Sequence, residues 1–405
     1  MIKTVKTPHI LLPKKGVDMS KYAVIACDQY TSNIPYWDSL KEYVGNSPST
    51  FHMIYPEAYL ENTDKESYIA SINKNIDSYL KDNVLEDIGE SFILVERVTS
   101  FGVRRLGLII SVDLEDYDFK KGSKALIRAS EATIVERIPP RLQIRKDAAI
   151  ELPHVLLLFD DKEKTIVEPL YRDRDKLEKV YDFELNKDGG HIRGYKISDV
   201  ESVVKKFDDL YHKNNNGLLF IVGDGNHSLA TAKAHWDIVK EKLSEKERET
   251  HPARYALVEV NNLYDDGIIF EPIHRILFNV KEDFIPRLRM SCHGEHRSYI
   301  YSNEGGKVEF FIDENAPQDY LQIQTFLDVY LKEHTDVKID FIHDDEELLN
   351  VAKANPGSVA IFMPALTKDD LFDYLSKDAV LPRKSFSMGH ANEKRYYLEA
   401  KKITK

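Results

Sequence analysis

The feature that most constrains the fold is a strand, a glycine-rich loop and a helix that follow one another between residues 218 and 243. Residues 218–222, LLFIV, are an apolar run with the length of a buried strand. Residues 228–243 carry apolar side chains at steps of three and four, as an amphipathic helix does. Such a unit directs the amides of the loop and of the first helical turn towards one point. We therefore expect an α/β fold, with mixed α+β character, that has a ligand site at this loop.

The loop itself, GDGNHS at residues 223–228, has the chemistry of a phosphate site. Its glycines let the backbone approach a ligand closely, and the unpaired N–H groups at a helix start attract anions. His227 can donate or exchange a proton beside them, and Asp224 is a candidate ligand for a magnesium ion. The alternative is a tight turn in which Asn226 or Ser228 only caps the helix. The pattern is neither a Walker motif nor a complete dinucleotide-binding fingerprint.

Between residues 91 and 275 the chain otherwise reads as short strands with one further helix. A turn at residues 100–102 predicts a hairpin within 91–114. An Asp-Asp-Gly turn predicts a second hairpin between strands at 254–262 and 267–274. The other expected elements are short strands within residues 124–145, 151–161 and 164–171, and a helix at 200–213.

Past about residue 275 the pattern changes to strands and helices that alternate, as in βαβ units. We therefore assign residues 1–275 to a mixed α/β domain that binds phosphate or nucleotide, and residues 276–405 to a C-terminal α/β region packed on it. The expected elements of this region are strands near 308–313, 337–343 and 358–364 and helices near 318–331, 346–353 and 367–375.

A second candidate site is the string RASEATIVER, residues 128–137, which places both charges between apolar residues. Phosphoryl transfer needs a proton acceptor and a group that neutralises the developing charge. We assign Glu131 as the general base and Arg128 or Arg275 as the neutralising group. If the string is a strand, alternation puts Arg128 and Glu136 on the face opposite Glu131. The alternative is an exposed strand edge with surface ion pairs.

Three more segments carry candidate residues. His274 and Arg275, in EPIHR, follow a strand, and His274 is either a substrate-binding, proton-transfer group or an ordinary half-buried histidine. Lys384 and Ser385, in PRKSF, either bind a carboxylate or phosphate of the substrate or form a plain basic loop. Cys27 lies in a loop that could line a pocket, but no base is apparent beside it, so we read it as a buried structural cysteine.

Composition excludes several classes of function. Lysine plus arginine number 56 against 68 aspartate plus glutamate, a net charge of −12, which argues against nucleic acid or an anionic membrane as the main partner. Two cysteines cannot build a disulfide framework, and no apolar run approaches the roughly 20 residues of a membrane span. We expect a cytoplasmic protein without a signal peptide.

Several motifs, in the same order and across nearly the whole chain, resemble the family of unknown function DUF1015. They are LEDYDF, IRASEATIVERIPPR, GDGNHSLATAK, HPARYALVEV and FEPIHR. Members of this family are often found beside serine-biosynthesis enzymes, so the resemblance implies serine or phosphoserine as a substrate.

A remoter resemblance covers only the loop and the start of the helix. The loop is similar to the G-x-H-R box of the ParB/sulfiredoxin superfamily, which includes nucleotide-binding partition proteins, sulfiredoxins and free serine kinases. This resemblance implies a mixed-sheet core in which the box holds nucleotide phosphates. Ser228 stands where those proteins have arginine, so Arg128, Arg137 or Arg275 would have to supply the guanidinium. The positions that the resemblance assigns to phosphate are Gly223, Asp224, Gly225, Asn226, His227 and Ser228.

The function that these observations favour is a small-molecule phosphotransfer or phosphate-handling enzyme, with ATP or ADP and Mg²⁺ as expected cofactors. Its partner would be a nucleotide or a phosphorylated metabolite. Two alternatives remain open at this point: a non-catalytic, ParB-like nucleotide-binding regulator, and a structural protein in which the loop is only a turn.

Overall fold

The chain forms two compact units in the computed structural model, which describes residues 2–302, 305–312, 316–377 and 380–405. Unit 1 consists of residues 1–129, 133–268 and 390–405, and unit 2 consists of residues 130–132 and 269–389. Both units mix helices with strands, as the predicted fold class requires. The sequence pattern predicts a single boundary at residue 275. In the structure, however, residues 130–132 belong to unit 2 although they lie within the sequence of unit 1, and residues 390–405 return to unit 1 after unit 2.

Unit 1 is built around a large mixed sheet. Most neighbouring strands are antiparallel, but β10 and β14 are parallel, as are β13 and β8, and β8 and β7. In spatial order the strands are β11 (Glu178–Leu185), β12 (Gly190–Ile197), β5 (Phe92–Val98), β6 (Arg104–Asp113), β14 (Tyr255–Asn262), β10 (Leu156–Phe159), β13 (Phe220–Asp224), β8 (Ile127–Ala129) and β7 (Tyr117–Asp118), and β1 (Val5–Lys6) also pairs with β6.

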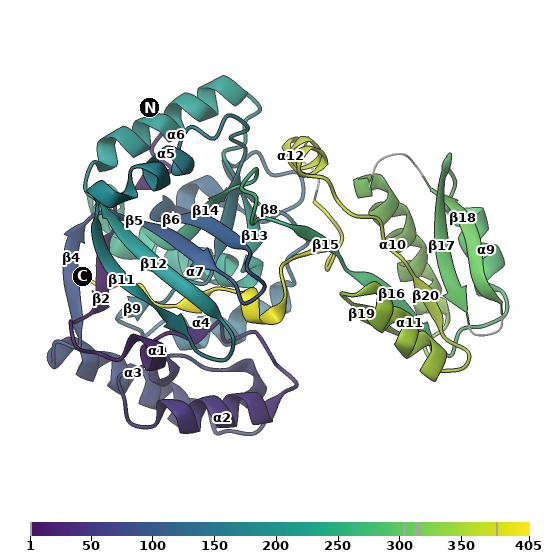
Figure 1. The fold of residues 1–405 in the computed structure, drawn as a ribbon, viewed down its shortest axis with the longest axis horizontal. Helices are drawn as coiled ribbons and strands as arrows, with labels where there is room; N and C mark the ends of the chain where they lie inside the picture. Colours follow the sequence, from purple (N-terminus) through teal and green to yellow (C-terminus); the bar gives the residue numbers. More distant parts are fainter. Residues whose placement is uncertain (1, 303–304, 313–315, 378–379) are drawn as a thin grey trace. The chain divides into compact units, whose positions relative to one another are not determined.

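Alternation along the central strands gives this sheet two apolar faces. In β5, Ile93 and Val95 belong to one hydrophobic core, and Phe92 and Leu94 belong to the other. The first core includes Trp37, which lies on α2. The helices α2 (Ile34–Val44) and α3 (Lys65–Lys81) cover the first face, and α6 (Val200–Asn214) and α7 (Asn226–Lys240) contribute to the second core (Figure 1).

The smaller elements of unit 1 complete this arrangement. Three short two-stranded sheets join segments that are distant in the sequence, and two of them tie residues near the C-terminus to unit 1. These sheets pair β2 (His9–Pro13) with β4 (Leu85–Glu90), β22 (Tyr396–Tyr397) with β3 (Val24–Ile25), and β23 (Lys401–Lys402) with β9 (Ile150–Glu151). The remaining α-helices are α1 (Met19–Tyr22), α4 (Ile138–Arg145), α5 (Val167–Arg172) and α8 (Glu245–Thr250).

The structure confirms the predicted hairpin of β5 and β6, the helix at 200–213 and the strand, loop and helix around residue 225. Two strand predictions are wrong. Residues 138–145 form α4, because Pro139 and Pro140 occupy its second and third positions, within the first turn, where no backbone donor is needed. Residues 167–172 form α5. The hairpin predicted through the Asp-Asp-Gly turn is also wrong, since β14 pairs with β6 and β10.

Unit 2 has its own sheet, in the order β18 (Gly306–Ile312), β17 (His296–Ser302), β20 (Val359–Ile361), β16 (His274–Phe278) and β19 (Lys338–Ile342). The predicted alternation of strands and helices is confirmed, but every pairing in this sheet is antiparallel, unlike that of βαβ units. Residue 313, the end of one predicted strand, lies outside the described residues. The other elements are β15 (Phe270–Pro272), β21 (Phe386–Met388), α9 (Phe284–Ser291), α10 (Ala316–Glu333), α11 (Asp345–Ala354) and α12 (Lys368–Ser376).

Among the described residues, none of the helices combines the length and the apolar character needed to cross a bilayer.

Candidate functional site

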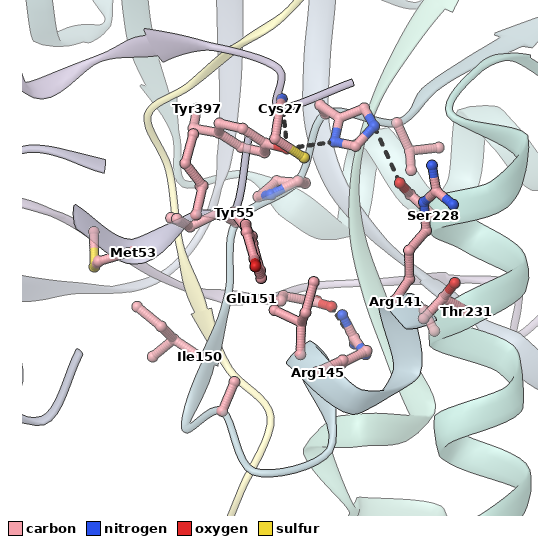
Figure 2. Close-up of a pocket in the computed structure, with 18 of the residues that line it drawn as sticks. Cys27, Met53, Tyr55, Arg141, Arg145, Ile150, Glu151, Ser228, Thr231 and Tyr397 are labelled. Carbon is pink, nitrogen blue, oxygen red and sulfur yellow. Dashed lines mark hydrogen bonds and ion pairs between the residues drawn. The ribbon is translucent and has the colours of Figure 1, made fainter. Parts of the chain in front are cut away.

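Unit 1 contains a cavity of about 200 Å³ beside the first turns of α7. Ser228 and Thr231 of α7 line it, and so do Arg141 and Arg145 of α4, the helix that packs against α7. Figure 2 shows these four side chains on one side of the cavity. Apolar side chains such as Met53 form much of the remaining wall. A mostly apolar hollow with a few converging polar groups is the usual form of a small-molecule site.

Gly225 is the residue that lets strand β13 turn into helix α7. Its φ of 86° lies in the left-handed region, which favours glycine. A Cβ at this position would lie 3.0 Å from the Cα of Val155, so the backbone of Val155 would have to give by a few tenths of an ångström. The close approach of these two segments therefore favours glycine at position 225.

The start of α7 presents amides that the helix cannot satisfy. The first amides of a helix have no partner within it, and no side chain caps this one. Within the described part of the chain, the amides of Asn226, His227 and Ser228 make no hydrogen bond to another segment. Gly225 differs, because its amide donates to its neighbour's carboxylate, Asp224 Oδ1, at 2.9 Å. The start of α7 is therefore free to receive an anion.

The surroundings of His227 favour a neutral ring with its proton on Nδ1. Its Nε2 accepts a hydrogen bond from the amide of Ile134 at 3.3 Å, so the ring proton lies on Nδ1. Burial, helped by the charges of Arg141 and Arg137, lowers the pKa of His227 to about 4. A histidine in this state can donate a hydrogen bond to an anion but has no ring nitrogen free to accept a proton.

Asp224 faces a cation of the protein itself. Its Oδ2 lies 3.3 Å from Nζ of Lys394, and its other oxygen accepts the amide of Gly225. In the described residues no group of three or more His, Cys, Asp or Glu side chains is arranged to hold a metal ion. This donor set does not fit a magnesium site built by the protein, because a lone carboxylate already paired with lysine offers too few oxygens.

A network of polar side chains centres on His154, which lies just before β10. Its Nε2 lies 3.0 Å from Ser228 Oγ and 3.6 Å from an oxygen of Asp28, and its Nδ1 lies 2.9 Å from the hydroxyl of Tyr397. Burial alone would lower the pKa of His154, but the charge of Asp28 raises it. Burial opposes the ionisation of Asp28, and the charge of His154 overcomes it and lowers the pKa of that carboxyl. These opposite pKa shifts, at a separation of 3.6 Å, favour an ion pair of the two groups beside Ser228.

Cys27 takes part in this network as a thiol. The hydroxyl of Tyr397 lies 3.1 Å from its Sγ and 3.3 Å from its backbone nitrogen (Figure 2). Burial raises the pKa of the Cys27 thiol to about 12, which removes the thiolate that a nucleophile needs. Cys27 therefore lines the cavity as a protonated thiol, in agreement with the structural role that the sequence predicts for it.

Two arginine–glutamate pairs complete the polar wall. Arg141 pairs with Glu57, and both side chains are about one-fifth exposed, at 23% and 20%. Arg145 pairs with Glu151 at 2.5 Å, and Glu151 also lies 3.5 Å from Lys401 and accepts the amide of Leu257 at 2.7 Å. Arginine presents a planar fork of donors that suits carboxylates and phosphates alike.

The structure distributes the residues predicted from sequence over both units. The GDGNHS loop lies in unit 1, and its Ser228 lines the cavity. Arg128 is also in unit 1, where its guanidinium donates to the carbonyls of Ala125 and Gly217 at 2.8 and 3.0 Å. Unit 2 contains Glu131, His274, Arg275, Lys384 and Ser385.

Glu131 and its neighbours form a structural cluster within unit 2. Its carboxylate accepts the amides of Lys384 and Ser385 at 2.9 and 3.0 Å, and β8 ends at Ala129, so the strand expected to extend to residue 137 stops earlier. Arg275 is fully buried and donates to the carbonyls of Ile273, Lys384 and Arg383. These contacts hold the loop before β21.

His274 and Ser385 also have partners inside unit 2. His274 Nδ1 accepts the amide of Met363 at 3.0 Å, and its Nε2 lies 2.6 Å from Asp345. Burial lowers the pKa of His274 despite this carboxylate. Ser385 Oγ donates to the carbonyl of Pro382 at 2.7 Å. The proposed substrate-binding roles of these residues and of Lys384 stay predictions.

Sequence reasoning missed most of the polar residues of the cavity. Glu57, Arg141, His154 and Tyr397 come from four separate segments; Arg141 ends the string IRASEATIVERIPPR, and the other three lie in none of the motifs quoted above. The signals that were available are weak: a histidine directly before an apolar strand, and arginines four residues apart at 137, 141 and 145.

Comparisons with known proteins give one firm result. A model of the family described as "Protein of unknown function (DUF1015)" matches residues 11–330. No curated protein matches the chain. Among solved structures, a conserved hypothetical protein from Pyrococcus furiosus is similar over 72% of this chain and 90% of its own, at 9% identity and a TM-score of 0.36.

Two further structures give similar values. A free serine kinase in complex with AMP is similar over 73% of this chain and 91% of its own, at 10% identity and a TM-score of 0.38. SbnI from Staphylococcus aureus with a C-terminal truncation covers 69% and 82%, at 8% identity and a TM-score of 0.37. TM-scores this low do not establish a common fold, so a ParB/sulfiredoxin-like core stays a prediction.

Proposed function

The chain belongs to the DUF1015 family, whose description names no activity, and we propose from the site itself that it is a phosphate-handling enzyme of small molecules. The observation that supports this most is the uncapped start of α7 beside a cavity that Arg141 and Ser228 line. Helix amides and a guanidinium are the two groups that proteins most often combine around a phosphate.

In this proposal the phosphate of a nucleotide or a phosphorylated metabolite lies at the start of α7. The amides of Asn226, His227 and Ser228 and the Nδ1–H of His227 donate to its oxygens. Arg141 takes the part of the arginine that the G-x-H-R box has at position 228. The apolar wall of the cavity holds the uncharged body of the ligand, which excludes water from the phosphate.

The ion pair of Asp28 and His154 supplies the charge and the proton handling for transfer. A cationic imidazolium 3.0 Å from Ser228 Oγ stabilises negative charge that develops at a phosphoryl group there. His154 also carries a proton that it can give to a leaving oxygen. Mg²⁺, where needed, would arrive with the phosphates of ATP or ADP, because Asp224 is paired with Lys394.

Serine and phosphoserine are the substrates to test first, because the sequence resemblance implies them. Calorimetry with ATP, ADP, AMP and phosphoserine, each with and without Mg²⁺, measures binding. Incubation with serine plus ATP or ADP, and separately with phosphoserine, measures serine phosphorylation and phosphate release. We expect binding of at least one nucleotide or phosphate ester and turnover in one of these mixtures.

A matched pair of variants locates the site. Arg141→Gln removes the charge in the cavity, and Arg172→Gln removes the same charge from an exposed position on α5. We expect R141Q to weaken ligand binding by about tenfold or more and R172Q to leave it unchanged. Absence of binding by every ligand contradicts the proposal. Binding without turnover would instead favour a nucleotide-binding regulator.

A further inference from the structure

Of the two arginine–glutamate pairs in the cavity, the pair of Glu57 and Arg141 lies where an anion is expected. Glu57 and Arg141 both line the cavity, and each is about one-fifth exposed. Arg141 also lies beside α7, since α4 packs against α7 and Figure 2 shows the Arg141 guanidinium close to Ser228. Its charge helps to lower the pKa of His227. A single guanidinium thus contacts the Glu57 carboxylate on one side and approaches the uncapped helix start on the other.

We propose that the Glu57 carboxylate occupies the place of the ligand's anion, and that an incoming phosphate or sulfate displaces it from Arg141. This inference rests on the proposed function, since it concerns the same site. It assigns Glu57 as the residue that sets the affinity for the anion. A ligand binds only if its anion interacts with Arg141 more strongly than the Glu57 carboxylate does. A weakly binding monoanion would fail this requirement, and an oxyanion with two charges that also contacts the helix amides would meet it.

The neighbouring pair shows why Glu57 in particular can leave. Glu151 is buried and has three partners, namely Arg145, Lys401 and the amide of Leu257, and together they lower the pKa of Glu151 against its burial. Glu57 has one side-chain partner among the described residues, Arg141. Burial outweighs that partner and raises the pKa of Glu57.

The surroundings of Glu57 agree with displacement. Asp28 repels its carboxylate, whereas Arg137 and His154 attract it more weakly than Arg141 does. A carboxylate that its site stabilises poorly costs little to move towards solvent, and Glu57 retains one-fifth of its surface exposed. Glu151 serves as the fixed anion of the cavity, and Glu57 as the exchangeable one.

The experiment measures sulfate binding by calorimetry at constant ionic strength, because sulfate keeps its charge of −2 over the whole working pH range. Glu57→Gln removes the competing carboxylate and keeps the shape of the side chain. Glu86→Gln is the matched control, since it makes the same change of net charge at an exposed position of β4. We expect E57Q to bind sulfate roughly three- to tenfold more tightly than wild type and E86Q to match wild type.

A double variant tests whether the gain in sulfate affinity acts through Arg141. In E57Q combined with R141Q the gain should disappear, because it depends on the released guanidinium. A gain that persists without Arg141 overturns the inference, and so does an E57Q affinity equal to or below that of E86Q. Should E57Q lose its cooperative melting, Glu57→Asp, which withdraws the carboxylate by one methylene, must still bind sulfate more tightly than wild type.

The outcomes separate this inference from the proposed function. Wild-type binding of sulfate and nucleotide with no gain in E57Q overturns the role of Glu57 and leaves the phosphate site intact. Absence of sulfate and nucleotide binding in wild type, E57Q and E86Q alike overturns the phosphate site, and the role of Glu57 falls with it.

Discussion

At the scale of single residues, the site depends on two histidines whose pKa values shift in opposite directions. Burial and two arginines lower the pKa of His227, whereas the charge of Asp28 outweighs burial and raises the pKa of His154. Both are histidines near the start of α7, so the difference arises from neighbours and not from residue type. The sequence predicts a role for His227 because of its motif, but it cannot predict the charge state, which depends on Arg141 and Arg137 from another helix.

The state of His227 can be observed directly. With its pKa near 4 and its Nε2 occupied by the amide of Ile134, the ring should remain neutral and protonated on Nδ1 from pH 6 to pH 8. NMR of protein with nitrogen-labelled histidine should show this tautomer, and the signal should vanish in His227→Gln, which assigns it. A ring that titrates near pH 6.5 would contradict the donor role given to His227.

Acid should destabilise unit 1 through His235, another residue of α7. Burial, with the charge of Arg145, lowers its folded-state pKa to about 4, and the unfolded pKa is about 6.5. Between these values the unfolded chain binds more protons, so the free energy of unfolding falls as the pH falls from about 6.5 towards 4. His227 adds to the same trend.

Urea unfolding at pH 7, 6 and 5 measures this dependence. Both tryptophans, Trp37 and Trp236, lie in unit 1, so their fluorescence follows that unit. The His235→Gln variant should lose less stability between pH 7 and pH 5 than wild type does. His212→Gln, at an exposed position on α6, is the control for removing a histidine. Equal pH dependence in H235Q and wild type would show that His235 is not the cause.

At the scale of elements, the unit formed by β13, the loop and α7 could be predicted, and most of its surroundings could not. Its apolar run, its glycines and its helical periodicity are all local signals. The sequence predicts strand where α4 lies, because two consecutive prolines usually end a regular element. Pro139 and Pro140 are nevertheless compatible with the first turn of a helix. Of the polar cavity residues, the sequence points to Ser228 through its loop and to Cys27 through a segment expected to line a pocket. Most of the others cannot be predicted, because contacts between distant segments leave no spacing in the sequence.

Gly225 is the residue whose replacement should disturb this unit most. An alanine there carries the cost of a left-handed backbone and also meets the backbone of Val155 at 3.0 Å. Gly16 provides the matched control, because it has a φ of 99° but open space around its Cβ position. We expect G16A to cost about 1 kcal/mol and G225A about 2–3 kcal/mol of unfolding free energy.

The same pair of variants should separate stability from binding. G225A shifts the start of α7, so it should also weaken sulfate binding, whereas G16A should not. Urea unfolding followed by tryptophan fluorescence gives the stability difference, and calorimetry gives the affinity. Equal costs for the two variants would mean that the contact with Val155 relaxes freely and that Gly225 is needed only for its φ.

At the scale of the whole molecule, the final segment of the chain belongs to the core of unit 1. Residues 390–405 follow unit 2 in sequence, yet they add β22 and β23 to unit 1 and bring Tyr397 to His154. Arg395 is 3% exposed and pairs with Glu259 and Glu399, which are exposed by 2% and 0%. Charged residues usually lie on the surface, so the sequence predicts that these three are exposed, whereas the structure buries them.

Replacing Arg395 should therefore destabilise unit 1 selectively. Arg395→Met leaves two buried carboxylates without their shared partner, which typically costs about 3–5 kcal/mol. Because unit 2 has its own sheet and no tryptophan, the fluorescence transition in urea should move to lower concentration while part of the circular dichroism signal persists. Adding Glu259→Gln and Glu399→Gln to R395M removes the stranded charges and should recover part of the loss. If R395M alone unfolds at the wild-type midpoint, the buried ion pairs do not hold the final segment in place, and its docking must come from β22 and β23 instead.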